Sequence, residues 1–246
     1  MLRLGFLLII PLLYCLKSKF DYCLNQYSKN KKALTVLLIL VTLALTFRVA
    51  HTTYRLSKSS FNMEDIAHVH LRAIPLLFVD HKNPYSEPID HYPVDSSKGV
   101  IDYSALKYPP LGLVFYAPFV AVFGDKGIYV GNALLYFLSA FLIYRGLLVF
   151  SRFHAYLGLL FFLASDFYFR LAMNRGTNDF LPTLFMLLGF IALKDKHFNK
   201  SGVYLGLSLL AKQFPGGLFL MICMFQKRWR ILIIAASIFF VGILLS

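Results

Sequence analysis

Long apolar runs constrain this chain more than any other feature. Crossing a bilayer takes about 20 apolar residues in a helix, because about 30 Å of hydrocarbon is crossed at about 1.5 Å per residue. Hydrophobic residues make up 58% of the chain and charged residues only 15%, whereas soluble domains are about a quarter charged. This balance excludes a soluble enzyme, a disordered chain and a nucleic-acid-binding domain. It predicts an all-α, polytopic membrane protein whose apolar runs are 4–16, 33–50, 111–123, 127–150, 153–169, 180–193, 202–225 and 231–245.

The distribution of charge predicts the orientation of these helices. The formal net charge is +13, and basic residues dominate four short segments, 17–32, 145–152, 194–200 and 227–230. Segments rich in lysine and arginine stay on the cytoplasmic side of a membrane. Residues 51–108 differ, because they hold seven of the twelve acidic residues against six basic ones. We therefore expect 51–108 to be a long exoplasmic loop.

Two local predictions follow from placing all the basic segments on one side. Only one crossing, 127–150, fits between the outer loop and Arg145, so 111–123 is expected to be a juxtamembrane helix in the outer leaflet. Residues 201–226 must leave the cytoplasmic side and return to it, which predicts a hairpin broken near Lys212 and Pro215. A single long helix over 201–226 is the alternative, and it would place one basic segment outside.

This topology brings polar residues that are distant in sequence to the outer face. Thr177 or Asn178 is predicted to cap the helix over 180–193, so that its N-terminus, beside Arg175, forms an anion site. The hairpin brings Lys212 to the same side. Two cations and a helix dipole suit a phosphate or diphosphate. The alternatives are a routine helix cap with an interfacial arginine, and a lysine whose amine extends to the membrane surface.

The outer loop contains a second group of candidates. A helix is predicted from residue 63 to Phe78, with Asp65, His68 and Arg72 on one face at i, i+3 and i+7. The opposite face is apolar and consists of Ile66, Val69, Ala73 and Leu76 or Leu77. A solvated polar face on an interfacial helix is the competing interpretation, and sequence chemistry alone favours it over catalysis.

The order of several motifs resembles a known family. The segments are Asn83-Pro84-Tyr85, Tyr108-Pro109-Pro110-Leu111, Asn174 with Gly176 and Asn178, Gly202 with Gly206 and Leu207, Lys212 with Pro215, and Arg228-Trp229-Arg230. Together they resemble the GT-C superfamily of integral-membrane glycosyltransferases. They are most similar to glycosyltransferase family 87, the polyprenyl-phosphate-mannose-dependent mannosyltransferases. The resemblance covers roughly residues 33 to 235.

The resemblance implies an inverting glycosyltransferase with a GT-C-like transmembrane helix bundle. It would move a hexose, with mannose as the expected sugar, from a polyprenyl-phosphate donor to a hydroxyl of a lipid or glycan acceptor, on the exoplasmic side of the cell membrane. Asp65 would be the catalytic base that takes the proton of the hydroxyl. Lys212, Arg175 and the helix N-terminus at Asn178 would stabilise the leaving phosphate. The remaining substrate-binding residues would be Tyr108 and His68.

The resemblance also sets expectations for cofactors and for domain organisation. The donor carries its own phosphate leaving group, so no cofactor and no metal site is expected, although Asp90 and Asp95 leave a divalent ion possible. We expect a single transmembrane domain over 1–246, with the C-terminal part of a full-length family member absent. The segment Arg175-Gly176-Thr177 departs from the Gly-Gln that the family often has after its first asparagine, which puts the donor specificity in question.

Two other functions remain open from the sequence. One is a non-enzymatic polyprenyl-lipid transporter or flippase, or a membrane subunit of a polysaccharide-assembly complex, which would share the phosphate site and need no base. The other is an inactive fragment of a longer enzyme. The long outer loop, rich in carboxylates and aromatic residues, favours the enzyme.

Overall fold

The computed structural model describes most of the chain from Asp65 onward and isolated positions before it. The described residues are 65–91, 102–104, 106–150, 152–165, 176–212, 216–217, 220–221 and 226–244, with isolated residues between 35 and 54 and at 169, 173, 223 and 224. The chain divides into two compact units, Met1–Arg48 and Val49–Ser246. In the first unit the described positions from 35 onward are helical, in agreement with the helix predicted over 33–50. The single domain over 1–246 stays a prediction.

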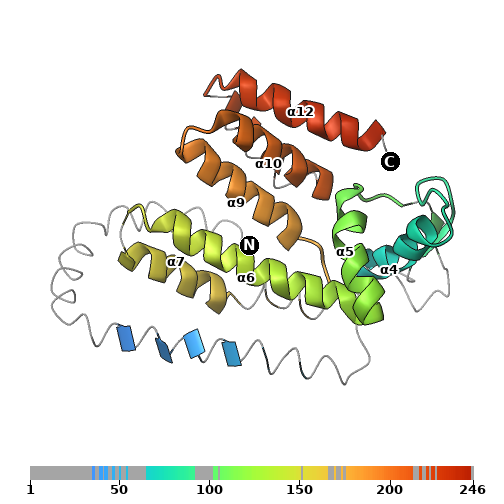
Figure 1. Cartoon of the computed structure of the whole chain (residues 1–246), viewed down its shortest axis with the longest axis horizontal. Coiled ribbons are helices and arrows are strands. Elements are labelled where there is room, and N and C mark those ends of the chain that lie inside the picture. Colours follow the sequence, from blue (N-terminus) through green and yellow to red (C-terminus); the bar gives the residue numbers. More distant parts are fainter. Residues whose placement is uncertain are drawn as a thin grey trace. The chain divides into compact units, whose positions relative to one another are not determined.

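The second unit is mostly helical, as predicted, and Figure 1 shows the order of its elements. Its helices are α4 (Asp65–Phe78), α5 (Leu111–Phe123), α6 (Gly127–Leu147), α7 (Arg152–Ala164), α9 (Phe180–Lys194), α10 (Phe198–Ala211) and α12 (Trp229–Leu244). A short antiparallel pair, β1 (Ile89–His91) and β2 (Asp102–Ser104), lies within the predicted outer loop. This pair was not predicted, because strands of three residues are too short to give a periodic pattern.

A sharp turn separates α5 from α6. The 3-10 helix η2 (Gly124–Lys126) begins at Gly124, whose φ of 58° and ψ of −139° suit glycine. A Cβ added to Gly127 would lie 2.4 Å from the carbonyl carbon of Phe119, so α5 and α6 are in close contact just beyond the turn. The predicted boundary of the helix over 111–123 is confirmed. Its depth in the outer leaflet stays a prediction.

The predicted break in the segment 201–226 is also confirmed. Helix α10 ends at Ala211, and Lys212 has an extended backbone with φ of −165° and ψ of 132°. The chain then folds back, because a Cβ added to Gly216 would lie 3.0 Å from the Ser208 hydroxyl oxygen. A single long helix over this segment is therefore excluded.

Helices α9, α10 and α12 lie side by side (Figure 1), and small residues allow their close approach. A Cβ added to Gly202 or Gly206 would lie 2.8 Å from the Cβ of Ile234 or Ile238 on α12. Glycines four residues apart form a groove on one helix face into which a neighbouring helix packs. On the other side of α10, the Ser201 hydroxyl donates a hydrogen bond to the Gly189 carbonyl of α9 at 2.9 Å. The Gly-x-x-x-Gly part of the family pattern thus has a packing role.

The described helices include one stretch that is long and apolar enough to cross a membrane, Leu111–Leu147, judged by length and composition. Large apolar side chains also face outward on three helices. Phe141 on α6, Phe190 on α9 and Phe240 on α12 are 56%, 50% and 63% exposed. Exposed apolar surfaces of this kind are normally covered by a partner or a membrane.

The contact between α10 and α12 can be tested by enlarging one glycine. Gly206→Leu forces a side chain against Ile238, and overpacking of this kind costs about 1–3 kcal/mol. We expect a lower thermal unfolding midpoint for the detergent-solubilised protein. Val203→Leu is the matched control, because Val203 lies on the same helix and is 38% exposed. Equal midpoints for the two variants would contradict the observed packing.

Candidate functional site

Four residues before α9, which we call the entry loop (176–179), lie between helices from three parts of the chain. A Cβ added to Gly176 would lie 2.7 Å from the Cβ of Ala67 on α4, and the φ of Gly176 is 71°. Both the close approach and the positive φ favour glycine at this position. The entry loop therefore lies against the first turn of α4, the helix that was predicted to carry the catalytic base.

The side chain of Lys212 forms an ion pair with the carboxylate of Asp179. This interaction joins the end of α10 to the start of α9. The two side chains are 30% and 34% exposed, so a ligand can reach the pair. The sequence analysis placed Lys212 at a phosphate site or at the membrane surface and named no carboxylate partner for it, whereas the structure gives it Asp179. Asp179 was missed, although an aspartate on the predicted outer face is the natural partner for a lysine at membrane depth.

The predicted cap of α9 is also corrected. The residue before the helix is Asp179, in helical conformation, and its side chain makes no capping hydrogen bond. Its carboxylate binds Lys212 instead. The hydroxyl of Thr177 and both polar atoms of the Asn178 side chain are buried and have no hydrogen-bond partner in the described structure. Thr177 and Asn178 therefore do not act as the cap.

The N-terminus of α9 offers fewer free N–H groups to an anion than the sequence suggested. The Leu181 N–H already donates to the Asn178 carbonyl at 3.3 Å, and Pro182 has no N–H. The Asn178 amide group is a stronger candidate. It is 1% exposed, and a buried amide without partners is normally completed by a water molecule or a ligand.

Helix α4 places the other predicted residues. Asp65 is the first residue of the helix, and its side chain is not among those described. His68 is partly buried and Arg72 is exposed, whereas Val69 and Ala73 on the predicted apolar face are fully buried. Arg175 lies outside the described residues, so its predicted position beside Lys212 stays a prediction.

The sequence interpretation missed His70, which is 1% exposed on the buried face of α4. Its Nδ1–H donates to the Ile66 carbonyl at 2.7 Å. Burial lowers the pKa of His70, and this hydrogen bond opposes the shift. The ring lies between Tyr108 and Tyr116, at centroid distances of 5.7 and 5.9 Å. His70 is therefore a neutral core residue that packs α4 against α5.

The two proline-containing motifs of the outer loop contact each other. The Tyr85 hydroxyl donates to the Tyr108 carbonyl at 2.9 Å, and the Leu106 N–H donates to the Pro84 carbonyl at 2.9 Å. The Asn83 side chain accepts from the Tyr85 N–H at 2.9 Å and closes the turn. Burial raises the pKa of Tyr85 to about 12, so its hydroxyl remains a donor at neutral pH. These contacts anchor the segment that precedes α5.

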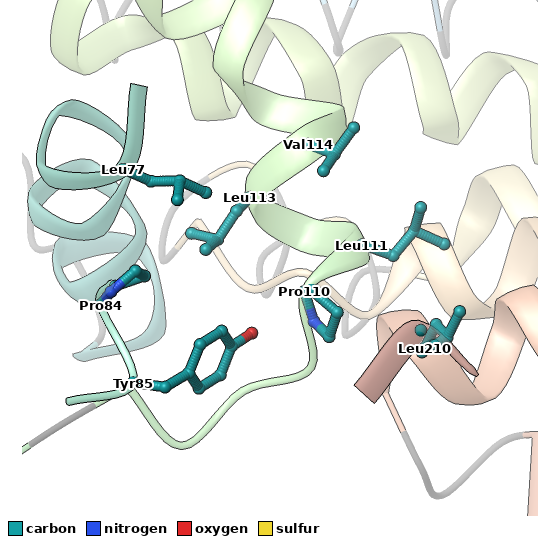
Figure 2. Close-up of a pocket in the computed structure, with 9 residues that line it drawn as sticks. Leu77, Pro84, Tyr85, Pro110, Leu111, Leu113, Val114 and Leu210 are labelled. Atoms are coloured by element: carbon teal, nitrogen blue, oxygen red, sulfur yellow. The ribbon is translucent and has the colours of Figure 1, made fainter. Parts of the chain in front are cut away.

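An apolar pocket of about 280 Å³ lies next to this anchor. Figure 2 shows its side chains converging from α4, from the segment that follows it, from α5 and from the end of α10. The lining residues are Leu77, Pro84, Tyr85, Pro110, Leu111, Leu113, Val114, Leu210 and Gly242. Leu210 lines the pocket two residues before Lys212, so this apolar space and the ion pair lie at the same end of α10.

A second pocket, of about 310 Å³, lies at the other end of α10. Its lining is polar and basic, and it consists of Lys196, His197, Phe198, Asn199, Lys200 and Arg230. These residues belong to the segments that were predicted to face the cytoplasm. Within the described residues, no group of three or more histidine, cysteine, aspartate or glutamate side chains lies close enough to hold a metal ion.

The unpartnered amide of Asn178 yields a stability prediction. Asn178→Leu replaces it with an apolar side chain of similar size, so the ligand-free protein should keep or raise its unfolding midpoint. Asn132→Leu is the matched control, because the equally buried Asn132 amide makes two hydrogen bonds. It should lower the midpoint, at a cost of about 1–3 kcal/mol for stranded partners. Thermal unfolding of both variants measures the difference, and equal destabilisation would mean that Asn178 already has a partner.

A comparison with known protein families assigns the chain. The model of glycosyltransferase family 87 matches residues 106–246, which is more than half of the chain and includes α5 to α12. Searches of curated proteins and of solved structures found no match. The family has glycosyltransferase activity, and together with the apolar stretch Leu111–Leu147 it indicates a membrane protein. The chain belongs to glycosyltransferase family 87.

Proposed function

We propose that this chain transfers a hexosyl group, with mannose as the expected sugar, from a polyprenyl-phosphate donor to a hydroxyl of a lipid or glycan acceptor. The observation that carries the proposal is the accessible Lys212–Asp179 pair, with the unpartnered amide of Asn178 on the residue directly before Asp179. Cationic and amide N–H groups gathered in this way suit a phosphate. The family assignment supports the transfer of a sugar.

Lys212 and Asn178 would bind the donor phosphate together. The Lys212 ammonium group has three N–H donors, and Asp179 occupies only one side of it. Asp179 would thus orient Lys212 while leaving donors for a phosphate oxygen. Arg175 directly precedes Gly176 of the entry loop, which supports its proposed role as a second cation at this site. These groups would stabilise the charge that develops on the leaving phosphate.

The apolar pocket would hold the first units of the prenyl chain. Its wall is almost entirely aliphatic, and Leu210 brings it within two residues of Lys212. A lipid with its phosphate at Lys212 has an apolar chain that needs a surface of this kind close by. Tyr108, whose carbonyl holds Tyr85 at the edge of the pocket, would then support the binding site through its backbone.

Asp65 would act as the general base. An acceptor hydroxyl is a weak nucleophile at neutral pH, so a carboxylate must take its proton as it attacks the anomeric carbon. The contact between Ala67 and Gly176 supports this role, because it brings the first turn of α4 to the entry loop. His68, one turn further along, would orient Asp65 or the acceptor. No metal ion or cofactor is required in this scheme.

The proposed site lies on the exoplasmic side of a multi-pass protein of the cell membrane, with the bilayer and the lipid-linked sugar as its partners. The charge asymmetry supports this orientation, because residues 51–108 carry most of the acidic side chains and the segments 17–32, 194–200 and 227–230 are basic. The two pockets at opposite ends of α10 agree with it. The basic pocket belongs to the proposed cytoplasmic end.

Removing the charge of Lys212 tests the phosphate site. A charge-assisted hydrogen bond contributes about 1.5–3 kcal/mol, so Lys212→Met should weaken binding of a polyprenyl-phosphate sugar by about 10- to 150-fold. Titration of the purified protein in nanodiscs measures this affinity. Lys194→Met is the control, because Lys194 is an exposed lysine at the far end of α9. Unchanged affinity in Lys212→Met would remove Lys212 from the site.

The two candidate carboxylates can be separated by kinetics. If Asp65 is the base, Asp65→Asn should lower kcat by about 10²–10⁴ while the donor KM stays near the wild-type value. Asp179→Asn should instead raise the donor KM, because Lys212 loses the group that orients it. The measurement is transfer of labelled mannose from polyprenyl-phosphate-mannose at varied donor concentration.

One result would contradict the assignment of Asp65 as the base, and another would contradict the enzymatic function itself. If Asp179→Asn abolishes kcat and Asp65→Asn does not, Asp179 is the base and the role of Asp65 is wrong. If the wild-type protein itself transfers no sugar, the lipid-transport function replaces the enzymatic one.

A further inference from the structure

Asn132, in the first half of α6, is fully buried, and its side-chain amide joins three elements. Its Oδ1 accepts a hydrogen bond from the Tyr116 hydroxyl of α5 at 2.6 Å. Its Nδ2 donates to the main-chain carbonyl of Thr177, in the entry loop, at 3.0 Å. One side chain therefore connects α5 and α6 to the loop that carries Asn178 and Asp179.

The Tyr116 end of this chain of hydrogen bonds is held rigidly. Tyr116 is 1% exposed and packs edge-on against His70 and Phe115. Gly131 makes room for the ring, because a Cβ there would lie 2.9 Å from the Tyr116 Cδ1. With Tyr116 fixed, the amide of Asn132 has one orientation that satisfies both partners, with oxygen toward Tyr116 and nitrogen toward Thr177.

The Thr177 end lies directly before the ion pair. Thr177 is two residues before Asp179, so a hydrogen bond to the Thr177 carbonyl holds the main chain close to that carboxylate. Lys212 directly follows α10, so its ion pair with Asp179 depends on where the entry loop places that carboxylate. Hydrogen bonds buried away from water fix such a loop strongly, because losing one strands its partner.

We propose that Asn132 is a positioning residue for the donor site, acting through the Thr177 carbonyl. The amide holds the entry loop so that Asn178 and Asp179 face Lys212 and the bound phosphate. This inference rests on the proposed donor site, and it assigns a role to α6, from which no candidate was predicted. The expected consequence is specific: loss of the amide weakens donor binding and leaves the acceptor side unchanged.

Steady-state kinetics with polyprenyl-phosphate-mannose test the inference. Asn132→Leu removes both hydrogen bonds and should raise the donor KM at least tenfold, while the acceptor KM stays within about twofold of the wild-type value. Tyr116→Phe keeps the ring, removes only the hydroxyl that orients the amide, and should shift the donor KM in the same direction by a smaller factor. If Asn132→Leu does not fold, the donor KM of Tyr116→Phe still tests the inference.

Ser201→Ala is the matched control. It removes one buried hydrogen bond to a carbonyl, that of Gly189, between α9 and α10. A merely structural role predicts that all three variants lower the yield of folded protein and leave the donor KM unchanged. That result, with an active wild-type protein, would overturn the inference. A wild-type protein that transfers no sugar from this donor would instead overturn the proposed function.

Discussion

The ion pair between Lys212 and Asp179 joins the end of α10 to the start of α9, and the proposed site is arranged around it. Asp179 lies directly before α9, and Lys212 lies directly after α10. The Asp179 carboxylate binds Lys212 and makes no capping hydrogen bond to α9, and the side-chain amide of the neighbouring Asn178 has no hydrogen-bond partner in the described structure. The pair is partly exposed, so it orients a lysine without burying it. A catalytic site for a phosphate leaving group requires this combination of fixed geometry and access.

The sequence predicted the helical parts of this fold well. The start of α5 at Leu111, the start of α6 at Gly127 and the end of α4 at Phe78 follow directly from apolar runs and from the prolines and glycines that interrupt them. The break at Lys212 was predicted because the segment 201–226 lies between two basic segments, 194–200 and 227–230, which should both be on the cytoplasmic side. The small sheet of β1 and β2 could not be predicted, because strands so short derive their stability from packing against α4 rather than from local pattern.

The candidate site was predicted only in part. Lys212 and Asn178 were identified because a cation in an apolar run and a polar helix start are local features of the sequence. Asp179 and Asn132 were not singled out, because their contacts are with residues 33 and 45 positions away in the sequence. A helix start can cap itself or bind a distant lysine, and only the tertiary packing of α10 decides between these. In the sequence, Asn132 is a single polar residue in an apolar helix. Its hydrogen bonds to the Tyr116 hydroxyl and the Thr177 carbonyl exist only in the folded structure.

The most direct test of this account is a cryo-EM structure of the protein with polyprenyl-phosphate-mannose in nanodiscs. We predict phosphate density in contact with Lys212 Nζ and the Asn178 amide, and density for the prenyl chain against Leu210. Phosphate density at the opposite end of α10, in the basic pocket formed by Lys200 and Arg230, would contradict both the proposed site and its exoplasmic orientation.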